Sequence, residues 1–361
     1  MKLRSLLRSA PLLLAFAALP AQAQNLHDAQ APAAADPRLT YEAASKSFDA
    51  GDYAGAVESY RATLRLEPDR AGAHHGLCVA SARLRRYADA LTACRRAVEL
   101  APADGLARLN LGRVYDELGR KEEAAAAMEE AARLMPDSPE VRYNLGGVYA
   151  DLGRREEAAA ALREAIRLRP DYAGAHACLG AVYYAAGRHE EAAACFREAA
   201  RLRPEMHEAH GSLGVALNAL GRYEEAAAGL QRALRLRPDY VDAHFHLAYT
   251  YLKLRQFGKA CEAAREAVRL DPSNAQAHSN LGVALFNRGK LKEAVEALGR
   301  AVRLKPDLAE AHYNLSVALL ALKDRPAALE HHRALQALAP PLADRLLDLI
   351  HADRVVNVSS K

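Results

Sequence analysis

A proline returns every 34 residues along this chain, and the interval never slips. An alanine and a leucine are invariant in the same register, twelve and two residues before each proline. A fixed period of this length is typical of a repeat architecture, in which each unit packs only against its neighbours. The sequence therefore predicts a stack of nine similar units. The prolines are Pro68, Pro102, Pro136, Pro170, Pro204, Pro238, Pro272, Pro306 and Pro340.

Each unit is predicted to contain two helices joined by a short turn. In the fifth unit, apolar residues at helical spacing (Ala175, Leu179 and Val182) are followed by Gly187-Arg188. Glycine can adopt the left-handed conformation that ends a helix. The second helix starts with acidic residues and ends with basic ones, which complements the helix dipole, and the proline prevents its continuation. We therefore expect an all-α protein.

A column of small residues falls in the middle of the first helices. Several units have glycine at this position, and others have Cys78, Ala248 or Ser316. We expect the invariant alanine of the second helix to approach the first helix here, because a large side chain would overpack the pair at a cost of about 1–3 kcal/mol. The glycines are Gly112, Gly146, Gly180, Gly214 and Gly282.

The period of 34 residues, with Leu-Gly, Tyr, Ala, Ala and Pro in this order, resembles the tetratricopeptide repeat (TPR). The resemblance covers residues 37–342. It implies a right-handed α-solenoid of about nine tandem helix-turn-helix repeats, which is a scaffold shared by proteins with many different partners. The first and ninth repeats depart from the pattern at Ala43-Ala44 and at Pro326, as terminal units of a solenoid often do.

A histidine column replaces the Trp that the family usually has near the start of each first helix. We expect these side chains to pack between helices, because equivalent positions about 10 Å apart cannot share one metal ion. His207 and His210, at i and i+3, could chelate a metal weakly. The column consists of His74, His176, His210, His244, His278 and His312, with Arg108 and Arg142 in two units.

The amino-terminal segment predicts the location of the protein. Residues 1–23 place Lys2, Arg4 and Arg8 before the run PLLLAFAAL and end in small residues, which predicts a signal peptide cleaved after Ala23. The apolar run is about half of the roughly 20 residues that a membrane-spanning helix needs. We therefore expect a periplasmic or secreted protein without a membrane span.

Two further segments flank the predicted repeats. Residues 24–36 are rich in Ala, Gln and Asp, which predicts a flexible linker. Residues 343–361 predict a C-terminal capping helix and tail, because Leu346, Leu349 and Ile350 lie on one helical face together with Leu342.

Charge and cysteine content narrow the function further. Cleavage of the predicted signal peptide lowers the net charge from +4 to +1, which gives no case for binding nucleic acid. The five cysteines lack the close spacing of zinc or redox sites. Cys78 and Cys94 fall on facing helices of one repeat, and the sequence leaves open whether they form a disulfide.

In this family, the first helices line a concave groove that binds extended peptides or short helices. The resemblance therefore implies a peptide-binding groove. Asn110 and Asn144 form one consecutive pair and Asn280 and Asn314 another, which resembles the asparagine ladder of O-GlcNAc transferase repeats. The alternative is that these asparagines are ordinary solvated residues. The predicted groove residues are Asn110, Arg113, Tyr143, Asn144, Tyr184, Asn218, Phe245, Tyr249, Asn280, Asn287, Tyr313 and Asn314.

Acidic residues outnumber basic ones at the predicted groove positions. A neutral to basic peptide with apolar side chains is therefore the expected ligand, and nucleic acid is not. The acids are Glu42, Asp49, Asp116, Glu117, Glu140, Asp151, Glu208, Asp242 and Glu310, and the bases are Arg38, Arg83, Arg113 and Lys253.

The sequence contains no enzyme signature. HEAH at 207–210 is one residue short of the HExxH zinc motif, and no phosphate-binding loop or nucleophile elbow is present. We expect a non-enzymatic scaffold, without cofactor or metal, that binds a protein or peptide partner in its groove. The alternative is a structural solenoid that self-associates or assembles with a neighbour through its ends or convex face.

Overall fold

The computed structural model of the chain describes residues 36–351 as two compact units divided after Ala186. The predicted signal peptide, most of the predicted linker and the C-terminal tail lie outside the described residues. Unit 1 contains α2 (Pro37–Asp49), α3 (Tyr53–Leu66), α4 (Ala71–Arg83), α5 (Tyr87–Leu100), α6 (Gly105–Glu117), α7 (Lys121–Leu134), α8 (Pro139–Asp151), α9 (Arg155–Leu168) and α10 (Ala173–Ala185).

Unit 2 continues the same pattern of helix pairs and ends in one additional helix. It contains α11 (His189–Leu202), α12 (His207–Ala219), α13 (Tyr223–Leu236), α14 (Val241–Lys253), α15 (Phe257–Leu270), α16 (Ala275–Asn287), α17 (Leu291–Leu304), α18 (Ala309–Ala321), α19 (Arg325–Leu338) and α20 (Pro340–His351).

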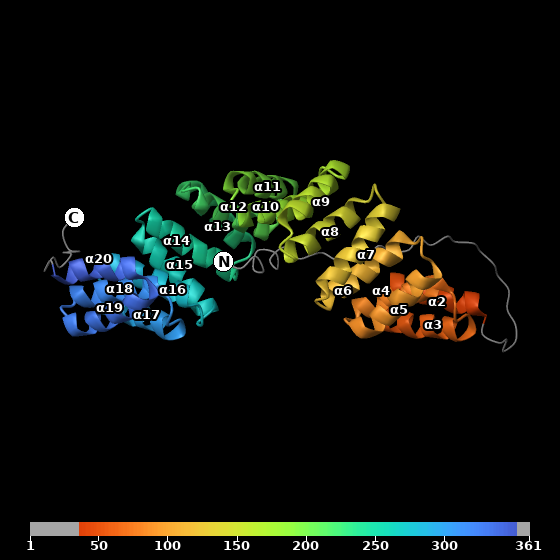
Figure 1. Cartoon of the computed structure of the whole chain (residues 1–361), viewed down its shortest axis with the longest axis horizontal. Helices are drawn as coiled ribbons and strands as arrows, with labels where there is room; N and C mark the ends of the chain where they lie inside the picture. Colours follow the sequence, from red (N-terminus) through yellow and green to blue (C-terminus); the bar gives the residue numbers. More distant parts are fainter. Residues whose placement is uncertain (1–35, 352–361) are drawn as a thin grey trace. The chain divides into compact units, whose positions relative to one another are not determined.

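Helices are the only regular secondary structure between residues 36 and 351. Within each unit, helices that follow one another along the chain pack together, and first helices of neighbouring repeats also touch, as α4 and α6 do (Figure 1). The all-α repeat fold predicted from the period is therefore confirmed.

A residue with a left-handed backbone conformation ends the first helix of each pair at the same position. The glycine after the first helix has a positive φ, for example 75° at Gly119 and 76° at Gly153, as the sequence predicts. Three turns lack glycine, and there Arg85, Arg255 and Lys323 adopt the same left-handed conformation, with φ between 57° and 64°. The turn geometry is thus kept even where the residue is unfavourable.

The small column on the first helices packs as predicted, but its closest contact is a different residue. A Cβ added to Gly146 would lie 3.3 Å from the carbonyl oxygen of the invariant Ala158 and only 2.6 Å from Cγ of Leu162. Gly214 has the same relation to Leu230, at 2.6 Å. The glycine therefore makes room mainly for a large apolar side chain four residues after the alanine.

The final helix, α20, covers the end of unit 2. It begins at Pro340 rather than at residue 343, and it packs against α18 and α19. Leu346 and Ile350 are buried in a cluster with Leu335 of α19. Leu349 lies at the edge of this contact and is partly exposed.

Candidate functional site

The predicted groove residues lie on the first helices of their repeats, which are α6, α8 and α10 in unit 1 and α12, α14, α16 and α18 in unit 2. In unit 1 most of these side chains are buried. Asn110, Arg113, Tyr143 and Asn144 are 1%, 4%, 6% and 3% exposed, and Tyr184 is half-buried. Their polar groups are bonded mainly to one another and to neighbouring helices.

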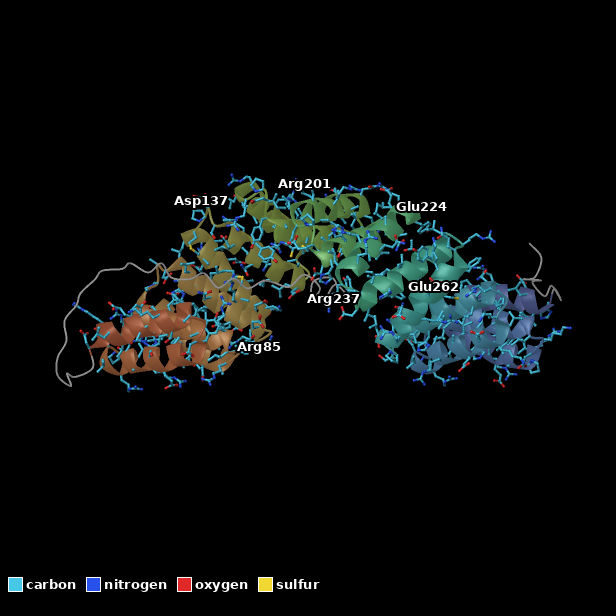
Figure 2. The ribbon with its side chains drawn as sticks, turned by 180° about the vertical axis from the view of Figure 1, so that it is seen from behind. Arg85, Asp137, Arg201, Glu224, Arg237 and Glu262 are labelled. Atoms are coloured by element: carbon cyan, nitrogen blue, oxygen red, sulfur yellow. A yellow bond between two sulfur atoms is a disulfide. The ribbon has the colours of Figure 1, made fainter. Side chains whose placement is uncertain are left out.

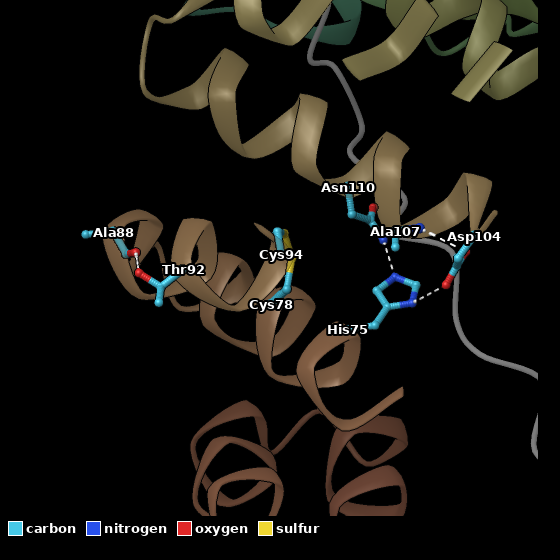
Figure 3. The surroundings of a disulfide bond; sticks show 8 residues. All are labelled: His75, Cys78, Ala88, Thr92, Cys94, Asp104, Ala107 and Asn110. Carbon is cyan, nitrogen blue, oxygen red and sulfur yellow. Dashed lines mark hydrogen bonds and ion pairs between the residues drawn. A yellow bond between two sulfur atoms is a disulfide. The ribbon is translucent and has the colours of Figure 1, made fainter. Parts of the chain in front are cut away.

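Asn110 is bonded to the preceding repeat through His75, which is itself buried (Figure 3). Nδ2 of Asn110 lies 2.8 Å from Nε2 of His75, and Nδ1 of His75 lies 3.5 Å from the Asp104 carboxylate. The Asp104 carboxylate also caps α6 by accepting from the backbone N–H groups of Leu106 and Ala107. The hydrogen bond from His75 is the main cause of a lowered pKa at Asp104. Nδ1–H of His75 therefore donates to Asp104, and Nε2 accepts from Asn110.

A second polar chain links α6, α8 and the turn after α9. Nε of Arg113 donates to Oδ1 of Asn144 at 3.3 Å, and Nδ2 of Asn144 donates to the backbone carbonyl of Glu140 at 2.6 Å. The carboxylate of Glu140 is paired with Arg169. Burial lowers the pKa of Arg113. These bonds hold neighbouring first helices together.

Aromatic and thiol groups complete the surface of unit 1. The ring of Tyr143 packs 4.8 Å from that of Tyr172, and Sγ of Cys178 lies 3.7 Å from the Tyr143 hydroxyl. Burial raises the pKa of Tyr172 to about 12 and that of Cys178 to about 11. Both groups therefore stay protonated and uncharged at neutral pH.

In unit 2 the side-chain amides of the predicted asparagines form fewer hydrogen bonds than those in unit 1. Oδ1 of Asn218 accepts a hydrogen bond from the Thr250 hydroxyl at 3.0 Å, and Nδ2 of Asn287 donates to the carbonyl of Val283 at 2.8 Å. Nδ2 of Asn218 and Nδ2 of Asn280 are buried and have no hydrogen-bond partner among the described residues. Asn314 is half-buried.

Three half-buried aromatic rings lie on the first helices of unit 2. Phe245 packs against His246, with ring centroids 4.8 Å apart. Nζ of Lys253 lies 5.2 Å from the ring centre of Tyr249, and the guanidinium of Arg345 lies 5.5 Å from that of Tyr313. Burial lowers the pKa of His246 to about 4, so its ring is neutral. This surface is aromatic and amide-rich.

Some of the predicted groove acids are already neutralised by neighbouring bases. Nζ of Lys121 lies 2.5 Å from the carboxylates of both Asp116 and Asp151. Glu208 lies 3.2 Å from Nδ1 of His207, but burial lowers the pKa of His207, so this neighbour does not neutralise the carboxylate at neutral pH. The negative charge that Asp116 and Asp151 present to a ligand is therefore smaller than a count of acidic residues indicates.

The histidine column has a structural role that the sequence analysis missed in its detail. Each Nε2 lies 2.7–3.1 Å from the carbonyl oxygen of the proline six residues earlier, and Nε of Arg108 bonds Pro102 in the same way. These hydrogen bonds tie each first helix to its preceding turn, and the expected packing of the column between helices stays a prediction. The fixed histidine-proline spacing of six residues was the available signal.

His207 and His210 each have partners of their own, and weak chelation of a metal by the two stays a prediction. His207 contacts Arg237 and Glu208, and His210 bonds the Pro204 carbonyl. Over residues 36–351, no group of three or more His, Cys, Asp or Glu side chains is placed to hold a metal ion.

A disulfide, which the sequence left open, joins Cys78 of α4 to Cys94 of α5, with Cα atoms 5.0 Å apart (Figure 3). Cys78 occupies the small-residue position of its repeat, and Cys94 the position that Leu162 fills in the fourth repeat. The covalent bond thus replaces the usual glycine-leucine contact. Cys178 and Cys261 are buried free thiols, and Cys195 is a partly exposed one.

No helix in the described part of the chain is long and apolar enough to cross a membrane.

Comparison with known families and structures identifies the repeats. The family model described as Cilia and flagella-associated protein 70 C-terminal domain matches residues 77–283, more than half of the chain. A tetratricopeptide repeat model matches residues 41–105, and a TPR repeat model matches residues 284–323. No curated protein matches.

Solved structures with the same fold include the APC/C hetero-tetramer Cut9-Hcn1, with a TM-score of 0.54 and 16% identity over 87% of this chain and 76% of that one. Pseudomonas aeruginosa pilF has a TM-score of 0.52 and 21% identity over 58% of this chain and 97% of its own. YrrB, described as a TPR protein with an unusual peptide-binding site, is 25% identical with a TM-score of 0.47 over 52% of this chain and 96% of that one. The first two likenesses show the fold alone.

Proposed function

Because this chain belongs to the tetratricopeptide-repeat family described as Cilia and flagella-associated protein 70 C-terminal domain, we propose that it is a scaffold that binds an extended peptide or helix of a partner protein. Tetratricopeptide repeats commonly mediate protein–protein interactions, and the fold is generally non-catalytic. The proposed binding surface is the row of first helices within each unit. Binding would need no cofactor and no chemical step.

The observation that carries this proposal is a set of unsatisfied carboxamide atoms on the first helices. Oδ1 of Asn110, Nδ2 of Asn218 and Nδ2 of Asn280 are buried without a hydrogen-bond partner among the described residues. Leaving such an atom unpaired costs about 1–3 kcal/mol. Because these atoms are closed to solvent, a peptide backbone would bond them only after the side chains rotate toward the ligand, and it then offers both a donor and an acceptor whatever its side chains.

The aromatic residues of unit 2 favour a ligand with apolar side chains. Phe245, Tyr249 and Tyr313 are half-buried, so each presents part of a ring beside the carboxamides. Aromatic side chains contribute large apolar contact areas at protein interfaces. Exposed acids such as Glu310 favour a neutral to basic peptide rather than an acidic one.

We also propose that the protein acts in the periplasm or outside the cell, after cleavage of residues 1–23. The disulfide between Cys78 and Cys94 supports this location, because disulfides persist mainly in oxidising compartments. Location is tested by fractionation of the producing cells and amino-terminal sequencing. An intact amino terminus on the cytoplasmic protein would contradict the proposal.

Selection from a random peptide library tests binding itself. The chain from residue 24 is compared with Asn280→Ala and with Phe245→Ala, and the controls are Glu224→Ala and Glu262→Ala. The control residues are exposed on second helices, where Figure 2 labels them. Because Nδ2 of Asn280 has no hydrogen-bond partner among residues 36–351, its removal should cost little stability. We expect selected peptides to bind Asn280→Ala about tenfold more weakly, which corresponds to about 1.4 kcal/mol, and to bind the controls normally.

Selection of no peptide would contradict groove binding. Concentration-dependent self-association in analytical ultracentrifugation would then favour the structural alternative, in which the solenoid assembles through its ends or convex face. Peptides that bind Asn280→Ala, Phe245→Ala and the controls equally would place the binding surface away from the first helices of unit 2.

A further inference from the structure

Two histidines from successive helices meet at the end of unit 2. Nδ1 of His312 on α18 lies 3.1 Å from Nδ1 of His331 on α19, and the ring centroids are 5.1 Å apart. His312 is buried, at 6% exposed, whereas His331 is partly exposed. The pair is therefore held by the protein on one side and reachable from solvent on the other.

The hydrogen bond that His312 shares with the rest of the histidine column determines which of its ring nitrogens carries the proton. Its Nε2 lies 2.9 Å from the carbonyl oxygen of Pro306, and a carbonyl can only accept a hydrogen bond. Nε2 must therefore carry the proton, which leaves the lone pair of a neutral ring on Nδ1. This arrangement is the one that orients a metal-binding histidine, where a backbone carbonyl fixes the tautomer through the other ring nitrogen.

We propose that His312 and His331 form a two-histidine binding site for a borderline divalent transition metal ion such as Zn²⁺ or Cu²⁺. Two nitrogens 3.1 Å apart, each about 2.05 Å from the ion, subtend an angle of about 98° at the metal. This angle lies between the right angle of a tetragonal Cu²⁺ site and the tetrahedral angle of Zn²⁺. Imidazole is a suitable ligand for both ions.

The surroundings keep both rings available to a metal. In the pair, Nδ1–H of His331 faces the Nδ1 lone pair of His312, so metal binding requires His331 to release its Nδ1 proton to water and to take one up at Nε2, which gives both Nδ1 atoms a lone pair. With only two protein ligands, the ion would keep open positions for water or for a donor from a bound partner.

This site does not depend on the proposed peptide binding, and its consequence is local. The metal would join α18 to α19 next to the terminal helix α20, which packs against both. Binding to the folded state alone would stabilise this end of unit 2 in proportion to the metal concentration.

Isothermal titration of the metal-free chain with Zn²⁺, and separately with Cu²⁺, tests the proposal at pH 7.5. His331→Ala is the main variant, because its partly exposed ring can be removed with the least disturbance of the fold. His278→Ala is the matched control, since His278 has the same bond to a proline carbonyl but its repeat contains no second histidine. His207→Ala controls for the other candidate chelator.

We expect the native chain and both controls to bind one equivalent of metal that His331→Ala binds at least tenfold more weakly. The Cu²⁺ complex should also show nitrogen hyperfine coupling that is lost in His331→Ala, and circular dichroism checks that this variant is folded. Equal affinity and stoichiometry in the native chain and His331→Ala would overturn the proposal and leave the pair as a hydrogen bond between two helices.

Discussion

The contact between Gly146 of α8 and Leu162 of α9 can be tested with a substitution that adds a single methyl group. In Gly146→Ala the new Cβ would lie 2.6 Å from Cγ of Leu162 and 3.3 Å from the carbonyl oxygen of Ala158. Overpacking of this kind costs about 1–3 kcal/mol. Alanine regains up to about 1 kcal/mol in helix propensity over glycine, so the net loss should be about 0–2 kcal/mol.

The adjacent residue provides a matched control. A Cβ at Gly147 would meet nothing within 4 Å, although both glycines lie on the same helix. Gly147→Ala should therefore stabilise the protein by up to about 1 kcal/mol through helix propensity alone. The two alanine variants should differ by about 1–3 kcal/mol, which is the packing term isolated from propensity.

A double-mutant cycle with Leu162→Ala separates packing from other effects. Leu162 is fully buried, so its truncation alone should cost about 2–5 kcal/mol. In the double variant the alanine methyl occupies part of the vacated space, as Ala248 and Ala264 do in the seventh repeat, where both are fully buried. The double variant should therefore lose at least about 1 kcal/mol less than the sum of the single variants.

Urea unfolding followed by circular dichroism gives the free energies, and hydrogen exchange of α8 and α9 shows whether the change is local. Because repeats unfold as coupled neighbours, the curves are fitted with a nearest-neighbour model rather than a two-state one. Equal stabilities of the two glycine variants, or additivity of the double variant within about 0.5 kcal/mol, would refute the explanation of the small-residue column.

Three further predictions concern single groups. Replacing Cys78 and Cys94 by alanine, or reducing the disulfide, should lower the unfolding free energy by about 2–4 kcal/mol in urea, and an unchanged midpoint would contradict a stabilising bond. Because burial raises the pKa of Cys178 to about 11, its thiol should resist iodoacetamide at pH 8 in the native chain and react after unfolding. The lowered pKa of Asp104 contributes stability that is present above the unfolded value of about 3.9 and is lost as pH falls through the lower folded value, so Asp104→Asn should remove that part of the acid dependence measured by denaturation from pH 2 to 7.

Most of the fold could be predicted from the sequence because the residues that end, pair and separate the helices recur every 34 residues. The glycine turns, the invariant alanines and the terminal prolines each recur in register, so each helix pair was located by the same pattern. The close contact of Gly146 with Leu162 was less visible. The invariant alanine is the conspicuous residue, whereas the large side chain four residues later varies in identity between repeats.

The candidate site was harder to predict because its hydrogen bonds join residues at different positions of neighbouring repeats. His75 and Asn110 are 35 residues apart, Arg113 and Asn144 are 31 apart, and Asn218 and Thr250 are 32 apart. An alignment of the repeats compares residues 34 positions apart. It therefore assigns these side chains to the correct helices, but it does not show which of them form hydrogen bonds with each other. The burial of the asparagines and their bonds to His75, Arg113 and Thr250 depend on the positions of atoms on neighbouring helices, which the sequence does not give.

The contact of His312 with His331 could not be predicted from the sequence for a related reason. The column drew attention to histidines at equivalent positions of different repeats. The partner of His312 instead lies 19 residues later, on the second helix of the same repeat.

The most direct test of the proposed scaffold function is site-specific photo-crosslinking in cells that produce the protein. A photoreactive amino acid replaces Phe245 on a first helix in one sample and the exposed Glu262 on a second helix in the other. We expect a discrete crosslinked adduct with one partner protein from position 245 and none from position 262. Adducts from position 262 alone would contradict binding along the first helices and would place the partner on the opposite helices of the repeats.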